Sequence, residues 1–492
     1  RLEPLGEIEI SNSPPAATNV QWIGAPVAGR RIEVLYTYSD TDGDPEGASL
    51  VAWQRDVPPF TNAATLQSGT NRAFVLSASP GDYVRAAVTP LAASGAATGT
   101  VAYSDWKGPL AASNALAVFH IGNSFTRWGH IPLQLRQLAN DAGFDHAYGE
   151  QLADGMGLAY HWTNGLPGGV ITRGTPARAE LATGSWDVLV LQPMSREWQP
   201  GLLAGFTAYA DLFAQLAATN GTRVVLYNYW NYLSENLSVQ DNINAAFETV
   251  RAALASNGVA AAIIPAGDVF RAVAENAGSG AFTNFLRADL YQDDYHPSDA
   301  GYYLSALVHF ATLYRQSPVG RTNGALSAAE SHDNPVLIET NLAAAFQQIA
   351  WDAARQHPQS GVARGRFDAW AQALPEGLRG LLDDRHGDGL ANLARWALGI
   401  GPDDVDYFDD LLTVTPDPSG HDWIRFRLGA DAEDAGVTVS VEWSPQLAEW
   451  FDGAPAGTVT NRTGEQIEIV PSAAWTNVYL RLRIRLPGES AP

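Results

Sequence analysis

Three polar residues in two distant segments of the chain have the types and spacing that nucleophilic catalysis needs. Ser124 lies in the segment Ile-Gly-Asn-Ser-Phe-Thr, and Asp293 and His296 bracket the segment Asp-Asp-Tyr-His far downstream. A hydroxyl is a weak nucleophile until a neighbouring base takes its proton, and an acid must in turn orient that base. We therefore expect Ser124 to be a nucleophile, His296 its base and Asp293 the acid. Asp289 and Asp294 are neighbours that could take the role of the acid instead.

The elements predicted around these residues would bring them to one edge of a sheet. The apolar stretch 115–121 predicts a strand that ends just before Ser124, and Gly122 permits a tight turn at its carboxyl end. The residues after Ser124 predict a helix, whose first N–H groups would point toward the reacting atoms. His296 stands directly before Pro-Ser-Asp at 297–299, which is typical of a helix start. Ligands of open α/β sheets bind at this carboxyl edge.

Residues 113–358 alternate between apolar strand patterns and amphipathic helix patterns. Strands are predicted at 115–121, 188–191, 223–229 and 259–264, and helices at 132–142, 203–218, 242–256 and 300–315. Strands that alternate with helices indicate parallel βαβ units. The sequence therefore predicts an α/β domain, a three-layer α/β/α sandwich with a parallel sheet.

Both flanks of this region predict β-sandwich domains. Residues 1–112 carry short alternating strands between turn residues, and they resemble immunoglobulin-like modules of bacterial extracellular proteins. That resemblance depends on Tyr-Ser-Asp-Thr-Asp-Gly-Asp-Pro-Glu-Gly at 38–47, followed by a strand with Trp53. Residues 359–492 predict a short helical linker and a small β-sandwich. Their loop His-Gly-Asp-Gly-Leu-Ala-Asn at 386–392 partly matches a C-terminal module of bacterial secreted hydrolases.

The central region as a whole resembles the SGNH (GDSL-type) hydrolases. The resemblance covers 115–315 and rests on Gly-Asn-Ser-Phe-Thr, a strand before the serine, a helix after the histidine and the late Asp-x-x-His. It implies the flavodoxin-like SGNH fold and a Ser–His–Asp triad formed by Ser124, His296 and Asp293. It also implies ester hydrolysis that requires no cofactor.

The same resemblance implies donors for an oxyanion hole, which stabilises the charge that builds on the carbonyl oxygen. The family's second block matches best at 154–162, which makes Gly155 a donor through its N–H, with Gly157 in reserve. The family's third block usually carries Gly-x-Asn-Asp, whereas this chain has Val-Leu-Gln-Pro-Met-Ser after an apolar strand. The amide of Gln192 could donate there, or Asn123 could contribute instead.

Aromatic residues gather near the ends of the predicted strands, where flat rings could stack on sugars. For any one of them, packing in the core is the alternative. The predicted substrate contacts are Trp128, Trp162, Tyr229 and Trp230.

A second group of candidate ligands lies in the N-terminal region, where acidic residues alternate in a glycine-containing loop. An oxygen-rich turn of this kind suits a structural Ca²⁺, and a polar hairpin turn is the alternative. The residues are Asp40, Asp42, Asp44 and Glu46.

The composition limits the partners of the protein. The 492 residues include 30 Lys and Arg against 53 Asp and Glu, a net charge of −23, so we expect neither nucleic acid nor an anionic membrane as partner. The chain has no cysteine, which excludes disulfides and a cysteine nucleophile. No apolar run was found to approach the roughly 20 residues of a membrane span, so we expect no membrane insertion. A start at Arg1 suits a mature secreted form.

Together these features predict a secreted or cell-surface bacterial serine esterase that removes O-acetyl groups from a polysaccharide. One alternative is a surface or matrix protein that uses the α/β domain as a scaffold or glycan-binding module. A further alternative keeps the triad but acts on lipid or aryl esters.

Overall fold

The computed structural model describes residues 12–95, 98–326, 335–387 and 390–404, and then separate stretches of the C-terminal region. Those stretches are 412–416, 422–427, 429, 432, 437–444, 451–452, 459–463, 466–470 and 479–486. The chain divides into two compact units. The first comprises Arg1–Ala261, Arg287–Ala306 and Gly324–Ile338, and the second comprises Ala262–Leu286, Leu307–Asn323 and Glu339–Pro492.

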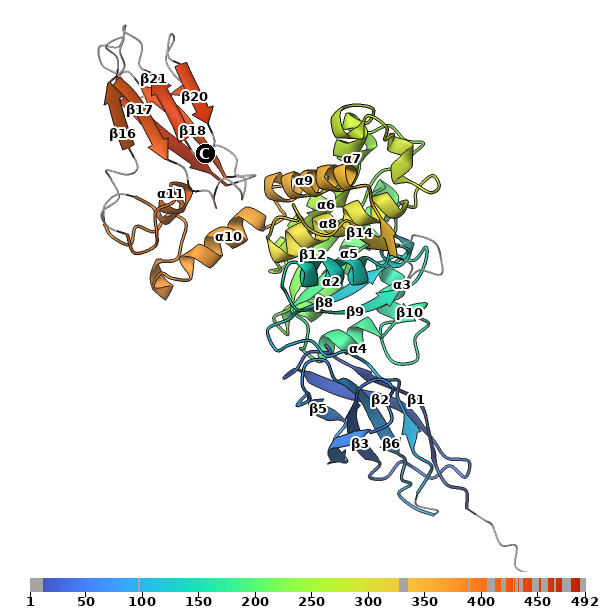
Figure 1. Cartoon of the computed structure of the whole chain (residues 1–492). Coiled ribbons are helices and arrows are strands. Elements are labelled where there is room, and N and C mark those ends of the chain that lie inside the picture. The colour runs from blue at the N-terminus through green and yellow to red at the C-terminus, as the bar shows by residue number, and fades with distance from the viewer. Residues whose placement is uncertain are drawn as a thin grey trace, which may run out of the picture. The chain divides into compact units, whose positions relative to one another are not determined.

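The N-terminal part of the first unit consists of two antiparallel sheets (Figure 1). One has the order β1-β2-β5, with bounds Ala16–Ile23, Arg31–Ser39 and Ala73–Val75. The other has the order β4-β3-β6-β7, with bounds Ala64–Gly69, Leu50–Asp56, Tyr83–Thr89 and Ala102–Tyr103. A shared core surrounds Trp22 and Trp53, whose rings meet edge to face at 6.4 Å. The immunoglobulin-like assignment stays a prediction.

Buried polar contacts join this β region to the α/β region within the first unit. The backbone N–H of Gly24 donates to a Glu180 carboxylate oxygen at 2.6 Å, and both atoms are buried. Arg30 forms an ion pair with Asp187 at 3.0 Å. These contacts explain why a single compact unit extends across the predicted boundary at residue 112. The boundaries of the three predicted domains stay predictions.

The α/β region of the first unit is built on a mostly parallel sheet in the order β10-β9-β8-β11-β12. Strands β8 (Leu116–Gly122), β9 (His146–Leu152), β11 (Val188–Leu191) and β12 (Arg223–Asn228) are parallel, and β10 (Arg173–Gly174) is antiparallel. Every residue of β11 is buried, as expected for a strand covered on both faces. The prediction of an α/β region with a parallel sheet is confirmed.

Six helices of the first unit accompany this sheet within the described residues. They are α1 (Ser124–Arg127), α2 (Ile131–Asp141), α3 (Leu158–Thr163), α4 (Ala177–Ala182), α5 (Pro200–Ala218) and α6 (Val239–Ser256). Helices α2 and α5 carry proline in their first turn, where its missing N–H breaks no helical hydrogen bond. The short η2 (Arg287–Leu290) and the pair β14 (Gly324–Leu326) and β15 (Pro335–Leu337) complete the unit.

Helix α5 is longer and more apolar than expected, because no apolar run was predicted to approach the length of a membrane span. By length and composition alone, its 19 residues could cross a membrane, a test that a core helix also passes. Its buried residues recur at helical spacing, including Phe206, Ala210, Phe213 and Ala217, and the helix packs on α3, α4, α6 and β12. This packing is that of a helix covering a sheet, and the absence of membrane insertion stays a prediction.

The second unit begins with the end of β13 (Ala261–Pro265), followed by α7 (Ala266–Asn276) and η1 (Gly280–Phe282). Helix α8 (Asp299–Tyr314) starts in the first unit and ends in the second. Next come α9 (Thr340–Gln356), α10 (Val362–Ala371), η3 (Glu376–Leu378) and α11 (Asn392–Ala397). A core around Phe367 and Trp396 joins α10 to α11, where a helical linker was expected.

The described C-terminal strands form two antiparallel sheets. One has the order β16-β17-β21-β20, with bounds Leu412–Pro416, Asp422–Arg427, Gln466–Val470 and Val459–Thr463. The other has the order β19-β18-β22, with bounds Phe451–Asp452, Thr438–Ser444 and Tyr479–Arg485. A β-sandwich in this region stays a prediction. Asp388 and Gly389 of the acidic loop lie outside the described residues.

Candidate active site

Ser124 is the first residue of α1, directly after the turn that ends β8. Asn123 caps this helix, because its side-chain oxygen accepts the N–H of Phe125 at 3.2 Å. Gly122 lies in close contact with its neighbours: a Cβ there would come within 2.6 Å of Thr126 Oγ1 and 2.7 Å of Gln192 Oε1. The strand–turn–helix predicted around Ser124 therefore requires glycine at position 122.

A continuous path of hydrogen bonds links Ser124 to His296 and Asp293. His296 Nε2 lies 2.9 Å from Ser124 Oγ, and His296 Nδ1 lies 2.7 Å from Asp293 Oδ2. The other oxygen of Asp293 accepts the backbone N–H groups of Tyr295 and His296, at 2.8 and 2.7 Å. Asp294 instead accepts the N–H and hydroxyl of Ser234, at 2.8 and 2.9 Å. The structure thus brings together the three predicted residues, with Asp293 as the acid.

The hydrogen bonds to Asp293 also set its charge. Partial burial raises the pKa of Asp293, but the side chain and backbone of His296 and the Tyr295 N–H outweigh it, and the pKa lies below its ordinary value. An ionised carboxylate only accepts hydrogen bonds, so His296 Nδ1 must carry the proton. His296 Nε2 is then free to accept the proton of Ser124.

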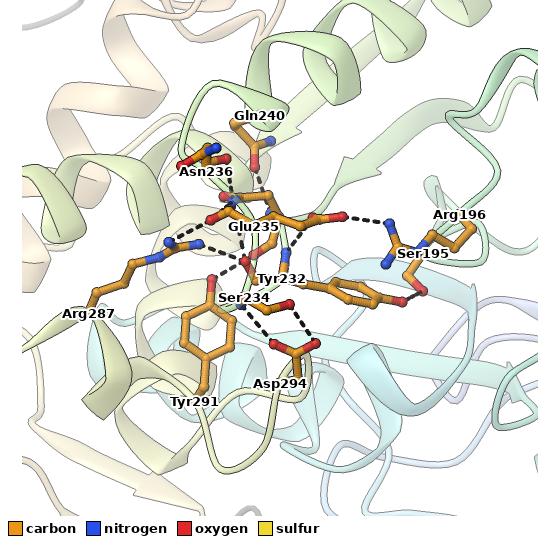
Figure 2. A network of polar contacts seen from close by, with 11 residues as sticks. Ser195, Arg196, Tyr232, Ser234, Glu235, Asn236, Gln240, Arg287, Tyr291 and Asp294 are labelled. Carbon is orange, nitrogen blue, oxygen red and sulfur yellow. Dashed lines mark hydrogen bonds and ion pairs between the residues drawn. The ribbon is translucent and has the colours of Figure 1, made fainter.

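A network of polar contacts fixes the loop that carries Asp293 and His296 (Figure 2). Arg287 donates to the carbonyls of Tyr232 and Glu235 at 2.7 and 2.8 Å, and the Tyr291 hydroxyl donates to the carbonyl of Asn231 at 2.8 Å. Trp230 Nε1 donates to the carbonyl of Tyr295 at 2.8 Å. No sequence pattern points to Arg287 or Tyr291, because their partners are backbone carbonyls of a distant loop.

Gln192 differs from its predicted role as an oxyanion donor. Its Oε1 accepts the Asn123 N–H at 2.9 Å and the Thr126 hydroxyl at 3.2 Å, and its amide nitrogen donates to the carbonyl of Pro193. The amide cannot be flipped, since its NH₂ would then face the N–H of Asn123. Gln192 is 0% exposed. Its side chain therefore stabilises the turn that carries Ser124 and does not face a substrate.

We expect Gln192→Met to lower the free energy of unfolding by about 1–3 kcal/mol, because the buried N–H of Asn123 loses its acceptor. Urea unfolding measures this loss. Gln215→Met on the exposed surface of α5 is the matched control, with a change within about 0.5 kcal/mol. A variant with unchanged stability whose kcat falls about 10²–10³-fold would instead favour the oxyanion role.

The side chain of Asn123 also forms structural hydrogen bonds. Its amide nitrogen donates to the carbonyls of Met156 and Pro193, at 3.1 and 3.3 Å. Neither contact leaves the Asn123 amide directed at a substrate, so the structure does not support its predicted oxyanion role.

Two backbone N–H groups near the nucleophile remain available as donors to a substrate carbonyl oxygen. Among the described residues, the N–H groups of Ser124 and Gly155 have no protein acceptor. Gly155 has a φ of +69°, which favours glycine, and lies in the loop whose Met156 carbonyl binds Asn123. The loop of the second predicted block is thus tied to the nucleophile turn.

The predicted substrate aromatics occupy three different environments. Tyr229 and Trp230 are 0% exposed and pack on Phe125, at 5.9 and 4.8 Å between ring centroids, so neither can stack on a sugar. Trp162 packs on Phe213 of α5 at 5.0 Å. These three belong to the core or to helix packing, which is the alternative noted for each. Of the four predicted aromatic residues, Trp128 is the one whose ring contacts the triad, at His296.

Tyr295 is a partly exposed aromatic beside the triad that the sequence analysis did not single out. Its side chain is 38% exposed, and its ring lies 4.2 Å from that of His296. It stacks on Tyr232 at 5.2 Å, and the guanidinium of Arg196 covers the Tyr232 ring at 4.0 Å. Its place inside the Asp-x-x-His segment is the signal that could have identified it.

The acidic loop of the N-terminal region does not form a cluster. Glu46 accepts the hydroxyl of Tyr36 at 2.5 Å and pairs with Arg72 at 3.0 Å, whereas Asp44 accepts the Ser94 hydroxyl. Asp40 accepts the N–H of Asp42 at 2.9 Å, as in a polar turn. In the described part of the chain, no group of three or more His, Asp or Glu could hold a metal. A calcium ion at Asp40, Asp42, Asp44 and Glu46 stays a prediction.

Asp154 carries a pH-dependent contact at the edge of the site. Partial burial raises the pKa of Asp154, but hydrogen bonds from Arg127 and Trp128 and the charge of Arg127 lower it below its ordinary value. A lowered pKa stabilises the fold fully above the unfolded value of about 3.9, and this stabilisation is lost as the pH falls through the folded value. We expect Asp154→Asn to flatten the decline of stability below about pH 4. Urea unfolding at several pH values measures the slope, and parallel curves for variant and wild type would contradict the prediction.

The chain was also compared with known proteins. No family model and no curated protein matches it. Similar solved structures include a DUF4886 family protein from Bacteroides uniformis, at 19% identity over 49% of this chain and 95% of that one, with a TM-score of 0.36. Others are a GDSL-like lipase from Bacteroides thetaiotaomicron (15% identity, 40% and 86% covered, TM-score 0.26) and an acetylxylan esterase from Geobacillus stearothermophilus (12%, 40% and 95%, 0.30). SGNH membership stays a prediction, and the activity must be argued from the site's own geometry.

Proposed function

We propose that this protein hydrolyses carboxylic esters through a triad formed by Ser124, His296 and Asp293. The observation that carries the proposal is the unbroken path from Asp293 Oδ2 through both nitrogens of His296 to Ser124 Oγ, with steps of 2.7 and 2.9 Å. The nucleophile lies at the carboxyl end of a parallel strand, where α/β proteins bind ligands.

The proposed reaction proceeds in two halves. Ser124 Oγ attacks the carbonyl carbon of the ester while His296 Nε2 takes its proton, and Asp293 stabilises the imidazolium through Nδ1–H. The tetrahedral intermediate collapses to an acyl-serine, and His296 returns the proton to the departing alcohol. Water, deprotonated by His296, then attacks the acyl-serine, the bond to Ser124 Oγ breaks, and His296 returns the proton to Oγ as the carboxylic acid leaves. The N–H groups of Ser124 and Gly155 are the proposed donors to the carbonyl oxygen.

For the substrate, we infer O-acetyl groups on a polysaccharide. Tyr295 supports this inference, because its exposed ring beside His296 offers a flat surface to a sugar ring. The hydroxyl-bearing Tyr232 and the charged Arg196 continue that surface. Ser124 is only 7% exposed, which suits a small acyl group. The proposal includes a secreted or cell-surface location, which the net charge of −23 favours.

A fluorophosphonate probe for activated serines tests the proposed function. We expect stoichiometric labelling of the full chain, with the label mapped to Ser124 by peptide mass spectrometry, and acetate release from an acetylated polysaccharide. No labelling, with retained glycan binding, would favour the scaffold alternative. Labelling with hydrolysis of aryl or lipid esters but no acetate release would overturn the inferred substrate class alone.

A further inference from the structure

Trp128 lies flat against the imidazole of His296. The ring centroids are 3.9 Å apart and the planes differ by only 15°. Phe125 meets the same imidazole edge-on, at 5.9 Å and 88°. Asp293 and Ser124 hold the two nitrogens of His296, and the indole is the ring that stacks parallel to the imidazole, whereas the Tyr295 ring at 4.2 Å is tilted by 43°.

A partly buried ion pair holds the indole in this plane. Trp128 Nε1 donates to Asp154 Oδ2 at 3.1 Å. Arg127 Nε donates to Asp154 Oδ1 at 2.7 Å, and a second guanidinium N–H donates to Oδ2. Asp154 therefore has fixed neighbours on both oxygens, and it sets the orientation of Trp128 as a consequence.

Resting on the proposed function, we propose that Trp128 is a positioning residue that stabilises the imidazolium of His296 formed when Ser124 loses its proton. The face of an indole carries negative potential and attracts a cation stacked on it. The neutral imidazole of the resting enzyme gains less from this contact. An interaction that strengthens as charge develops raises kcat rather than affinity.

Other groups also act on the charge of His296, and the test must separate them from Trp128. Asp293 on Nδ1 favours the cation most directly, and the carboxylate of Asp154, which accepts the indole N–H, also favours it, while Arg127 offsets part of that charge. The remaining groups against the catalytic pair are uncharged rings and hydroxyls, namely Phe125, Tyr295, Ser124 and the Tyr302 hydroxyl, which donates to the Ser124 carbonyl. Replacing Trp128 by Leu or by Phe removes the N–H that the indole donates to Asp154, so the difference between these two variants isolates the stacked face.

An NMR titration of His296 in the full chain tests the proposal without relying on turnover. The imidazole C–H signals of ¹³C-histidine-labelled protein are followed with pH, and His296→Gln assigns the signal. We expect Trp128→Leu to lower the pKa of His296 by about half to one pH unit, and Trp128→Phe to lower it less. Trp162→Leu, which removes an indole that packs on Phe213, is the matched control and should leave the titration unchanged.

Kinetics provide the second measurement. On a short acyl aryl ester, we expect Trp128→Leu to lower kcat about three- to tenfold with little change in KM, and to move the acid limb of kcat/KM to lower pH by the same half to one unit. Trp128→Phe should restore part of both. An unchanged pKa of His296 in Trp128→Leu would overturn the proposal.

A second variant keeps the test decisive. If Trp128→Leu does not fold, Trp128→Phe answers the question by titration, and an unchanged pKa of His296 in Trp128→Phe would overturn the proposal. If the chain shows no hydrolysis that depends on Ser124, the proposed function fails while the titration still decides the role of Trp128.

Discussion

Ser124→Ala should lower kcat for ester hydrolysis by about 10⁴- to 10⁶-fold, with little change in substrate binding. The hydroxyl lost is the one 2.9 Å from His296 Nε2, and within the site no second nucleophile is placed on that nitrogen. His296→Ala should cause a loss of the same order. Because nucleophile and base act as one unit, the double variant should be hardly worse than either single variant. Initial rates on a short acyl aryl ester measure all three.

The matched control for this prediction is Ser234→Ala. Its hydroxyl binds Asp294 at 2.9 Å in the neighbouring network, so its loss should change kcat by no more than a few-fold (Figure 2). Substantial activity left in Ser124→Ala would mean that hydrolysis occurs elsewhere in the chain, and additive losses in the double variant would mean that Ser124 and His296 do not act as one unit.

The triad was predictable because each member has a local signature in the sequence. A strand that ends at a glycine turn places Ser124 at the ligand edge of the sheet. The three-residue spacing of Asp293 and His296 lets one carboxylate bond both the imidazole and the backbone of the same tight loop. Such short-range geometry can be derived from residue order alone.

The roles of Gln192 and Asn123 could not be derived in this way. A side-chain amide both donates and accepts, and only the three-dimensional neighbours decide which of these it does. The backbone N–H of Asn123 donates a hydrogen bond to Gln192 Oε1, and this contact joins residues 69 positions apart in the sequence. The sequence revealed an amide near the site but not the direction in which it points.

Long-range packing also explains the errors with aromatic residues and one missed strand. Strand β12 ends at Asn228, and Tyr229 and Trp230 then turn inward against Phe125 instead of lining an open loop. Strand β9 went unrecognised because its sequence His-Ala-Tyr-Gly-Glu-Gln-Leu lacks an apolar run. Its polar side chains find partners inside the fold: Glu150 binds Arg173, for example, at 2.5 Å. Sequence patterns cannot show partners of that kind.

The second large effect is expected for Asp293→Asn, which should lower kcat about 10³- to 10⁴-fold without unfolding the site. One oxygen of Asp293 accepts two backbone N–H groups, from Tyr295 and His296, and in the variant only the amide oxygen can replace it. The NH₂ group must then face His296 Nδ1 and donate to it. That hydrogen bond moves the imidazole proton to Nε2, where it blocks the transfer from Ser124.

Asp294→Asn is the control that makes this prediction specific to geometry rather than to charge. It removes a carboxylate from the adjacent residue, yet Asp294 bonds Ser234 and has no hydrogen bond to His296. We expect its kcat to stay within a few-fold of wild type, while Asp293→Asn loses most activity at an unchanged melting temperature. Equal, modest losses in both variants would mean that the local negative charge, and not the tautomer set by Asp293, governs the base. A large loss confined to Asp293 would instead tie catalysis to the single oxygen that holds Nδ1–H, because the two substitutions are otherwise chemically identical.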